Sequence, residues 1–384
     1  MRIKVLHISK MKGVSGSENH LLTLLAGLDK QRFEVALCIL AESRHLPLLQ
    51  DYRKTLAQTD VAVSMLVTHK YFDVKVFLTL KRYIAQGQFQ IVHTHLIHAD
   101  VYGTLAAKLA GVPVIVSSRH NDDRFRRYKV LVWLNRLLAR WHAKIIVISD
   151  WVGRFLQEVE GIPGDKIVRI HYGLQPETIT AQADPHYVRQ QLQIPEGGPV
   201  IGTIGRLTAQ KGHPYLLQAI AKVKAQFPEL RVVILGDGEL RAELEQQATN
   251  LGVETNVIFT GYRNDAIKLL SGFDFFVFPS LWEGFGLVLL EAMALKKAIV
   301  ASAVSAIPES VLDGQTGILV PPQDADRLAE AILKLLQDRS LANRMGEAGY
   351  EYLQQQFTVS KMVSATENLY TELCRRGKIN SPAM

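Results

Sequence analysis

The sequence has little cysteine and no long apolar run, and both absences narrow the class of protein. Its 384 residues include two cysteines, Cys38 and Cys374, which lie far apart and lack the spacing of metal ligands. A reducing compartment is the simplest fit. The apolar run at the N-terminus is too short for a signal peptide, and no segment reaches the roughly 18 apolar residues of a membrane span. We therefore expect a cytoplasmic protein that does not cross a membrane.

Motifs of several other classes are also missing. The glycine-bearing turn at 13–18 lacks the G-x-G-x-x-G spacing of a dinucleotide fingerprint, and no G-x-S-x-G nucleophile elbow is present. No His, Cys and Asp cluster has metal spacing. The pair Asp324 and Asp326 looks like a metal-binding D-x-D, but it precedes a helical pattern, so we expect an N-cap. The cations are scattered without a recognition motif, which argues against nucleic-acid binding.

The composition is that of a globular protein with two domains. Hydrophobic residues make up 48% and charged residues 21% of the chain, and 384 residues exceed the size of one ordinary core. The formal charge of +7, with a pI near 9.2, favours anionic partners. Nucleotides, phosphorylated substrates and an anionic membrane surface all fit that charge.

Short β-branched runs alternate with longer amphipathic stretches in two series, which predicts two α/β domains with parallel sheets. The expected strands of the first series are 3–8, 33–40, 61–67, 90–94, 113–117 and 143–148. Those of the second series are 199–204, 230–235, 256–260, 273–278, 298–301 and 317–320. The polar segment 174–185 is the expected linker, and helices with a break near 357–358 follow residue 324. Ligands bind beyond the carboxyl ends of such strands, so two facing domains would share a cleft.

The stretch 273–295 predicts a strand, a glycine loop and a helix. Its apolar run stops at Pro279, and glycines interrupt the pattern before the helical repeat. The free N–H groups and positive dipole of such a helix form a seat for phosphate. Glu283 lies in the loop and Glu291 in the helix, about 12 Å apart at 1.5 Å per residue, which suits the two ends of one long ligand. A solvated loop residue and a helix-face charge are the alternative.

Two cations follow the first strand of the second series. Arg206 and Lys211 suit a diphosphate, because fixed charges there can neutralise a leaving phosphate; a solvated basic loop is the alternative. The turns at 235–240 and 261–265, with Gly236 and Arg263, could hold a base or a ribose, or serve turn geometry alone.

Two features of the first series also follow strand ends. Gly16, in the first loop, lets the backbone approach a phosphate, although most such turns need glycine only for geometry. His120 stands at the mouth of the sheet, where it can donate a hydrogen bond to a sugar hydroxyl or a phosphate; a capping or loop histidine is the alternative. Residues 124–141 combine basic residues with two tryptophans, as an interfacial membrane helix would, or pack a helix on its own sheet.

Taken together, these motifs resemble the C-terminal half of family 4 glycosyltransferases, which are retaining enzymes of the GT-B fold. The matching residues, in order, are Gly205-Arg206, Lys211, Gly236-Asp-Gly238, Glu283-Gly-Phe-Gly286 and Glu291. The likeness covers nearly the whole chain. It implies two Rossmann-like domains whose parallel sheets face each other across a cleft: residues 1–178 on the acceptor side and 186–358 for the nucleotide sugar. A helix at about 360–376 is expected to cross back to the first domain.

The resemblance also implies the roles of single residues. Arg206 and Lys211 would bind the donor diphosphate, Glu291 the ribose, and His120 the donor sugar near the reacting carbon. Glu283 and the backbone after it would hold the donor sugar and phosphate. The other implied donor-binding residues are Gly16, Gly236, Arg263, Gly284, Phe285, Gly286 and Leu287. Two departures from the family are His171-Tyr172-Gly173, where Asn-Gly is common, and Ser15-Gly16, where Gly-Gly is common.

The implied reaction moves a sugar from a nucleoside diphosphate to an acceptor hydroxyl with its anomeric configuration retained. It needs no metal or other cofactor, and we expect front-face attack in which the departing phosphate helps take the acceptor's proton. The acceptor could be a glycan, a lipid-linked molecule or a small molecule, and contact with the inner face of a membrane stays open. A nucleotide-sugar epimerase or hydrolase, or a non-catalytic binding protein, are the competing interpretations.

Overall fold

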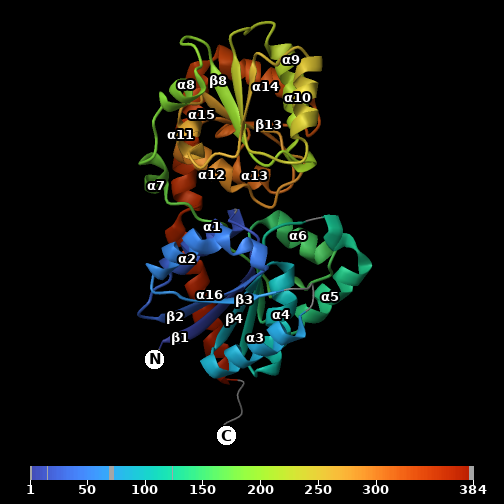
Figure 1. Ribbon diagram of the computed structural model, residues 1–384, viewed down its shortest axis with the longest axis vertical. Coiled ribbons are helices and arrows are strands. Elements are labelled where there is room, and N and C mark those ends of the chain that lie inside the picture. The colour runs from blue at the N-terminus through green and yellow to red at the C-terminus, as the bar shows by residue number, and fades with distance from the viewer. Residues whose placement is uncertain (1, 15, 69–72, 123, 380–384) are drawn as a thin grey trace. The chain divides into compact units, whose positions relative to one another are not determined.

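The chain divides into two units after Gly173 (Figure 1). The first unit comprises the residues up to Gly173 together with those from Val359 onward, and the second unit is Leu174–Thr358. The computed structural model describes residues 2–14, 16–68, 73–122 and 124–379.

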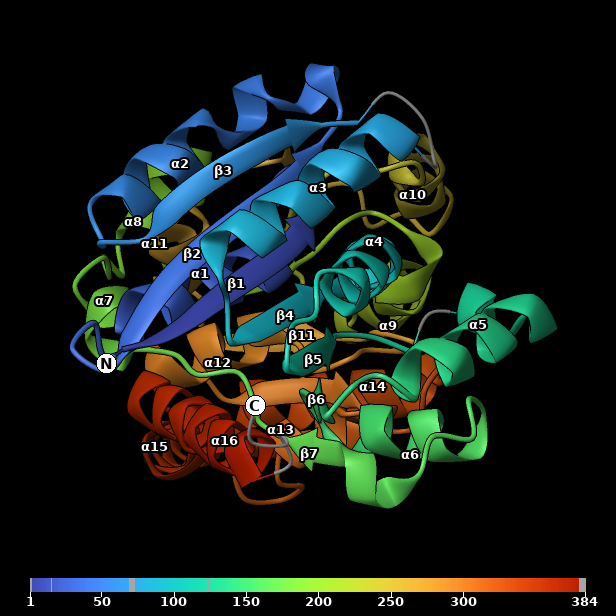
Figure 2. The ribbon, with the colours of Figure 1, turned by 90° about the horizontal axis from the view of Figure 1, so that it is seen from below.

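The first unit contains a parallel sheet with the strand order β3-β2-β1-β4-β5-β6-β7 (Figure 2). This is the order of a Rossmann-like sheet, with one further strand at its edge. The strands are β1 (Ile3–Lys10), β2 (Phe33–Ala41), β3 (Ala62–Val67), β4 (Ile91–His95), β5 (Val114–Arg119), β6 (Lys144–Val147) and β7 (Ile167–Arg169). The helices are α1 (Gly16–Gly27), α2 (Gln50–Ala57), α3 (Val74–Gly87), α4 (Leu96–Leu109), α5 (Lys129–Ala139), α6 (Asp150–Glu158) and α16 (Val359–Ile379).

The alternation of side chains along β1 gives this sheet two apolar faces. Val5 packs in a cluster with α1, α2 and α16, whereas Leu6 and Ile8 point the other way, into a cluster with α3 and α4. Both faces of a parallel sheet are thus covered by helices, as its continuous apolar strands require.

The second unit repeats the architecture with the strand order β10-β9-β8-β11-β12-β13, all parallel. Its strands are β8 (Val200–Ile204), β9 (Arg231–Leu235), β10 (Val257–Gly261), β11 (Phe275–Phe278), β12 (Ile299–Ser302) and β13 (Gly317–Val320). Its helices are α7 (Pro176–Thr180), α8 (Tyr187–Leu192), α9 (His213–Val223), α10 (Arg241–Asn250), α11 (Ala266–Ser271), α12 (Leu287–Ala294), α13 (Ile307–Ser310), α14 (Ala325–Gln337) and α15 (Arg339–Gln356). Short 3-10 turns across the chain are η1 (Ser43–His45), η2 (Pro47–Leu49), η3 (Arg124–Arg127), η4 (Gly164–Lys166) and η5 (Ala209–Lys211).

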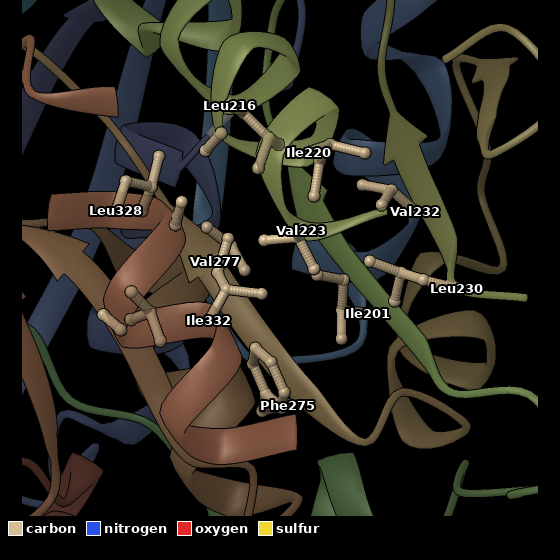
Figure 3. Packing of buried hydrophobic residues seen from close by; sticks show 14 of the residues in the cluster. Ile201, Leu216, Ile220, Val223, Leu230, Val232, Phe275, Val277, Leu328 and Ile332 are labelled. Carbon is tan, nitrogen blue, oxygen red and sulfur yellow. The ribbon is translucent and has the colours of Figure 1, made fainter. Parts of the chain in front are cut away.

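The core of the second unit lies between this sheet and the helices α9 and α14. Figure 3 shows Leu216 and Ile220 of α9 meeting Val277 of β11, with Ile332 of α14 beside them. All four side chains are fully buried. Asp324 caps α14 by accepting a hydrogen bond from the Arg327 N–H at 2.9 Å, so the D-x-D sequence serves as a cap, as expected.

The helix α16 follows the second unit in sequence but packs in the first. The break before it falls at 357–358, as expected, and in Figure 1 the red α16 lies among blue and cyan elements. It approaches α1 closely, because a Cβ placed on Gly27 would lie 2.7 Å from Cγ2 of Val363. Tyr370, in the middle of α16, is fully buried in the first unit's core.

The boundary between the units differs from the expected linker. Residues 174–185 contain α7, which packs against α12 and therefore belongs to the second unit. The Leu174 N–H donates to the Phe357 carbonyl at 2.8 Å, so a backbone hydrogen bond joins the two ends of the second unit. Within the described residues, no helix combines the length and the apolar character needed to cross a membrane.

Candidate functional site

The glycine loop before α12 is built as the sequence predicts. β11 ends at Phe278 and α12 begins at Leu287, with Gly286 at φ +87° as its N-cap. Glycine adopts this left-handed conformation without strain. Phe285 is buried and packs edge-on against Phe357, with ring centroids 5.5 Å apart. The loop is thus anchored by its own side chain, while the first N–H groups of α12, including that of Leu287, have no carbonyl within the helix.

A lysine and a glutamate meet at this loop. Nζ of Lys211 lies 2.6 Å from Oε2 of Glu283, and the two side chains are only 16% and 14% exposed. The same ammonium lies 4.8 Å from the ring centroid of Phe278. The sequence suggested separate roles for these two residues; the structure makes them one ion pair beside the N-terminus of α12.

Two glycines allow the strand-end turns to approach one another. A Cβ on Gly212 would lie 2.0 Å from the Pro279 carbonyl oxygen, and one on Gly236 would lie 2.0 Å from that of Gly205. Gly236 has φ +134°, and its N–H donates to the Gly261 carbonyl at 2.9 Å. A side chain at either glycine would therefore separate the turns after β8, β9 and β11.

Arg206 projects from the turn after β8 and is exposed. Among the described residues, no hydrogen bond or ion pair engages its guanidinium. The Leu207 N–H beside it donates to the Asp237 carbonyl at 2.9 Å, which holds the turn. Arg206 is therefore a positive charge whose hydrogen-bond donors are available to an anion.

Glu291 lies in the second turn of α12, and its carboxyl group is half-buried. Burial raises the pKa of this carboxyl to about 7. Across the described part of the chain, no cation or hydrogen-bond donor pairs with it. A carboxyl in this state gains from a ligand that donates hydrogen bonds to its ionised form.

Arg263 has a partner within its own turn. Its Nε donates to Oδ1 of Asp265 at 2.8 Å, and its Nη2 donates to Oδ2 at 2.5 Å. The hydroxyl of Tyr187 donates to the same carboxylate at 2.8 Å. The hydrogen bonds from Arg263 are the largest cause, and with the bond from Tyr187 they lower the pKa of the Asp265 carboxyl to about 2. The charge of Arg263 is thus compensated, which weakens it as an anion ligand, and its donor-binding role stays a prediction.

In the first unit, the predicted residues lie at the ends of β1 and β5. Gly16 is the first residue of α1 and is exposed, whereas the sequence placed it in a loop. His120 is 7% exposed; its Nδ1 lies 2.7 Å from the hydroxyl of Tyr172, and its Nε2 lies 3.4 Å from Nδ1 of His95. Burial, and then the charges of Arg119 and a second arginine, lower the pKa of His120 to about 3.

The surroundings of His120 were not foreseen from the sequence. Tyr172 belongs to the segment where the family pattern is broken, which was the one available signal. The ring of His20 in α1 lies tilted against that of Tyr172, with ring centroids 4.2 Å apart, and among the described residues its buried Nδ1 has no hydrogen-bond partner. His20 therefore joins His120 as a polar side chain that a ligand at these strand ends could engage.

The basic segment at 124–141 is only partly exposed. Arg126 is buried and its Nη2 lies 2.7 Å from Oε1 of Glu160, so this cation is unavailable to a membrane. Tyr128, Val130 and Trp133 are 68%, 75% and 65% exposed.

Residues 14–178 match the family described as Glycosyltransferase Family 4, and residues 187–352 match Glycosyl transferases group 1. Each match falls mainly on one of the two units. The chain therefore belongs to glycosyltransferase family 4 and is a glycosyltransferase of the GT-B fold. Among similar structures is that of Anabaena Alr3699/HepE in complex with UDP and glucose, with a TM-score of 0.84, 21% identity, and coverage of 97% of this chain and 100% of that one.

Individual relatives act on different molecules. N-acetyl-alpha-D-glucosaminyl L-malate synthase of Bacillus anthracis is 30% identical over 328 residues, which cover 83% of this chain and 84% of the relative. UDP-Gal:alpha-D-GlcNAc-diphosphoundecaprenol alpha-1,3-galactosyltransferase of Escherichia coli is 25% identical over 381 residues, 97% of each chain. One name specifies a malate product and the other a lipid-linked acceptor.

Proposed function

We propose that the protein transfers a sugar from a nucleoside diphosphate to an acceptor hydroxyl with retention of the anomeric configuration. The second unit binds the donor, and the acceptor is a glycan, a lipid-linked molecule or a small molecule. The complexes of the Anabaena structure with UDP and glucose, and with UDP-glucose, support a nucleotide-sugar donor.

The observation that carries this proposal is the cationic seat at the strand ends of the second unit. Lys211 is held by Glu283 at 2.6 Å beside the N-terminus of α12, and the nearby Arg206 is unpaired within the described residues. A diphosphate would gain two cations and the positive N-terminal end of the helix. Glu291, deeper in the same helix, would accept hydrogen bonds from the ribose.

This arrangement supports a leaving-group mechanism without a metal ion. Fixed cations and a helix N-terminus stabilise the charge that develops on the departing diphosphate. Glu283 is engaged by Lys211, which favours a positioning role over that of a free nucleophile. We therefore propose front-face attack, in which the departing phosphate takes the acceptor's proton.

Substitution of the cations tests the proposal. Lys211→Ala and Arg206→Ala should each lower kcat by about 10²- to 10³-fold, the range for losing one stabilising donor. Lys222→Ala is the control. This lysine also forms an ion pair in the second unit, with Asp326, but its side chain is half-exposed and lies on α9. Its rate should stay near wild type. The assay includes EDTA, which should leave the wild-type rate unchanged.

Near-normal rates in both cationic variants, with circular dichroism showing folded protein, would contradict the assignment. The competing interpretations are separated by incubating a nucleotide sugar without an acceptor. Rapid isomerisation or release of the sugar would favour an epimerase or a hydrolase. Binding without turnover for any acceptor would favour a non-catalytic protein.

We also propose that the enzyme is cytoplasmic and touches an anionic membrane surface through α5 and the turn before it. Tyr128, Val130 and Trp133 are exposed there, with the exposed cations Arg127 and Lys129 beside them. Exposed aromatic and aliphatic side chains next to cations are typical of an interfacial helix. Cosedimentation with vesicles that contain phosphatidylglycerol measures this contact.

A further inference from the structure

A group of buried histidines lies next to His120 in the first unit. His7 of β1 and His93 and His95 of β4 are at most 2% exposed, and β1 and β4 are neighbouring strands. Burial lowers the pKa of each of the three well below its ordinary value, so their rings are neutral. A neutral imidazole carries one N–H and one bare nitrogen.

The ring nitrogens form a continuous series of contacts. Nδ1 of His120 lies 2.7 Å from the Tyr172 hydroxyl, and Nε2 of His120 lies 3.4 Å from Nδ1 of His95. Nε2 of His95 lies 2.9 Å from Nδ1 of His7, whose Nε2 lies 3.3 Å from the hydroxyl of Tyr370.

Beyond Tyr370 the series continues for two more contacts. The Tyr370 hydroxyl lies 2.6 Å from Nδ1 of His93, and Nε2 of His93 lies 2.7 Å from the hydroxyl of Ser118. We call this series the histidine chain. Its members, in order, are Ser118, His93, Tyr370, His7, His95, His120 and Tyr172.

Each contact of the histidine chain needs one proton, which couples the tautomers of its rings. If His120 donates from Nε2, His95 must accept at Nδ1 and donate from Nε2, and His7 must do the same. The reverse sense would place every proton on Nδ1. The four rings therefore carry their protons on Nε2 together or on Nδ1 together.

The two tyrosines select one of these senses. A phenol hydroxyl is a stronger acid than a neutral imidazole N–H, and an imidazole nitrogen is a better acceptor than a phenol oxygen. Tyr370 can donate one proton, and its contact with His93 at 2.6 Å is shorter than that with His7 at 3.3 Å. O–H donors make the shorter bonds, so Tyr370 donates to His93 and accepts from His7. By the same argument from bond length, the 2.7 Å contact between the Tyr172 hydroxyl and Nδ1 of His120 is one in which the tyrosine donates.

We propose that the histidine chain fixes the proton of His120 on Nε2, and that Tyr370 of α16 is a positioning residue for His120 through His7 and His95. The Nε2–H of His120 then donates to His95 and its Nδ1 accepts from Tyr172, so both the tautomer and the orientation of this ring are fixed. The effect on sugar transfer rests on the proposed function, whereas the tautomer of His120 does not depend on it.

A metal ion is the competing explanation for His7, His93 and His95, whose ligand atoms lie within 4.8 Å of one another. The 2.9 Å between the nitrogens of His7 and His95 is a hydrogen-bond distance. Two nitrogens on one tetrahedral zinc, at 2.0–2.1 Å each, would be separated by about 3.3 Å. The contacts therefore favour protons over a metal.

Nuclear magnetic resonance of the wild-type protein with ¹⁵N-labelled histidine tests the proposal without any substitution. Long-range ¹⁵N–¹H correlations distinguish the tautomers, and His→Gln variants assign the resonances. We expect His7, His93, His95 and His120 all to carry the proton on Nε2 at pH 7. A proton on Nδ1 of His120, mixed tautomers among the four, or a stoichiometric metal whose removal by EDTA shifts these resonances would overturn the proposal.

Tyr370→Phe tests whether the effect travels along the histidine chain. It leaves the buried Nε2–H of His7 without an acceptor, so His120 should populate both tautomers although its own contacts are unchanged. We expect kcat to fall roughly fivefold with little change in KM, as for one lost buried hydrogen bond. Thr366→Val removes another buried hydroxyl of α16, which donates only within its helix to the Met362 carbonyl, and should leave the tautomers and kcat unchanged.

An unchanged His120 tautomer in Tyr370→Phe would overturn the positioning role, whatever the rate. The spectra and the rates also separate this inference from the proposed function. The wild-type protein could carry all four protons on Nε2 and yet transfer no sugar. That result would support the proposed role of the histidine chain and contradict the proposed function.

Discussion

At the scale of single residues, the site depends on charges that the protein leaves uncompensated. Arg206 has no partner among the described residues, and Glu291 is half-buried without one. Lys211, by contrast, is held in place by Glu283. The half-buried carboxyl of Glu291 costs stability in the free protein when it is ionised, and a ligand that donates hydrogen bonds to it offsets this cost.

If Glu291 binds the donor as proposed, donor binding should depend on pH. Its pKa is raised to about 7, so the carboxyl is largely protonated at pH 6 and ionised at pH 8. In the proposed role only the ionised form accepts hydrogen bonds from the ribose, so Kd for the donor should be about tenfold weaker at pH 6 than at pH 8. Isothermal titration calorimetry, with the nucleotide sugar that most raises the melting temperature in a panel, measures this change.

Glu291→Gln is the control for that titration, and its Kd should be nearly the same at both pH values. The folded pKa lies above the ordinary value of 4.5, so the unliganded wild type loses stability as pH rises from about 4.5 to about 7. The variant should therefore melt at a higher temperature than wild type at pH 8 while binding donor more weakly. An equal pH dependence in both proteins would contradict this role of Glu291.

At the scale of elements, hydrophobic patterning predicted nearly every strand to within a few residues. β7, with three residues, is too short to show a period, and α7 is a single turn inside a polar segment. Each was missed because local pattern carries little information at that length. Both are fixed instead by tertiary contacts, β7 by pairing with β6 and α7 by packing on α12.

The sequence pointed to candidate site residues one by one, but not to their pairings. Glycine, cation and carboxylate spacing pointed to Lys211 and Glu283, yet nothing local joins two residues 72 positions apart. The histidine chain was even harder to predict from the sequence. His7 and His93 occur inside apolar strands, and Tyr370 lies 277 positions beyond His93. Only the strand order and the return of α16 bring these rings together.

We expect membrane contact through the exposed face of the helix α5. Val130→Ser with Trp133→Ser removes two side chains that are 75% and 65% exposed, so folding should be unaffected. Burying such side chains in an interface contributes about 1.5–3 kcal/mol each at most, so vesicle binding should weaken by roughly tenfold or more. Cosedimentation with vesicles rich in phosphatidylglycerol measures the loss.

A matched control changes exposed apolar residues elsewhere in the first unit. Leu48 and Leu109 are 62% and 61% exposed, and their double change to serine should leave vesicle binding intact. Binding should also fall in high salt and on vesicles of neutral lipid, because Arg127 and Lys129 act through charge. Equal binding by both double variants would contradict a contact through α5.

At the scale of the whole molecule, the two units differ in how their cores are assembled from the chain. The second unit is one continuous segment, Leu174–Thr358. The first unit is completed only when α16 returns, after the second unit has been made. Its core cluster takes five residues from this helix: Met362, Val363, Leu369, Tyr370 and Leu373.

Truncation after Thr358 should therefore destabilise the first unit, although its strands lie far from the deletion in sequence. The second unit, which directly precedes the deletion, should stay folded. Removing one large buried side chain costs about 2–5 kcal/mol, so losing five costs about 10–25 kcal/mol, which matches or exceeds the 5–15 kcal/mol that typically stabilises a domain. We expect the amides of β1 and β2 to lose protection from hydrogen exchange, while those of β8 and β9 keep theirs. A chain ending at Arg376 retains every core residue of α16 and should match the full-length protein. Protection of β1 and β2 in the shorter chain would show that the first unit folds without α16, and that the helix is an attachment rather than part of its core.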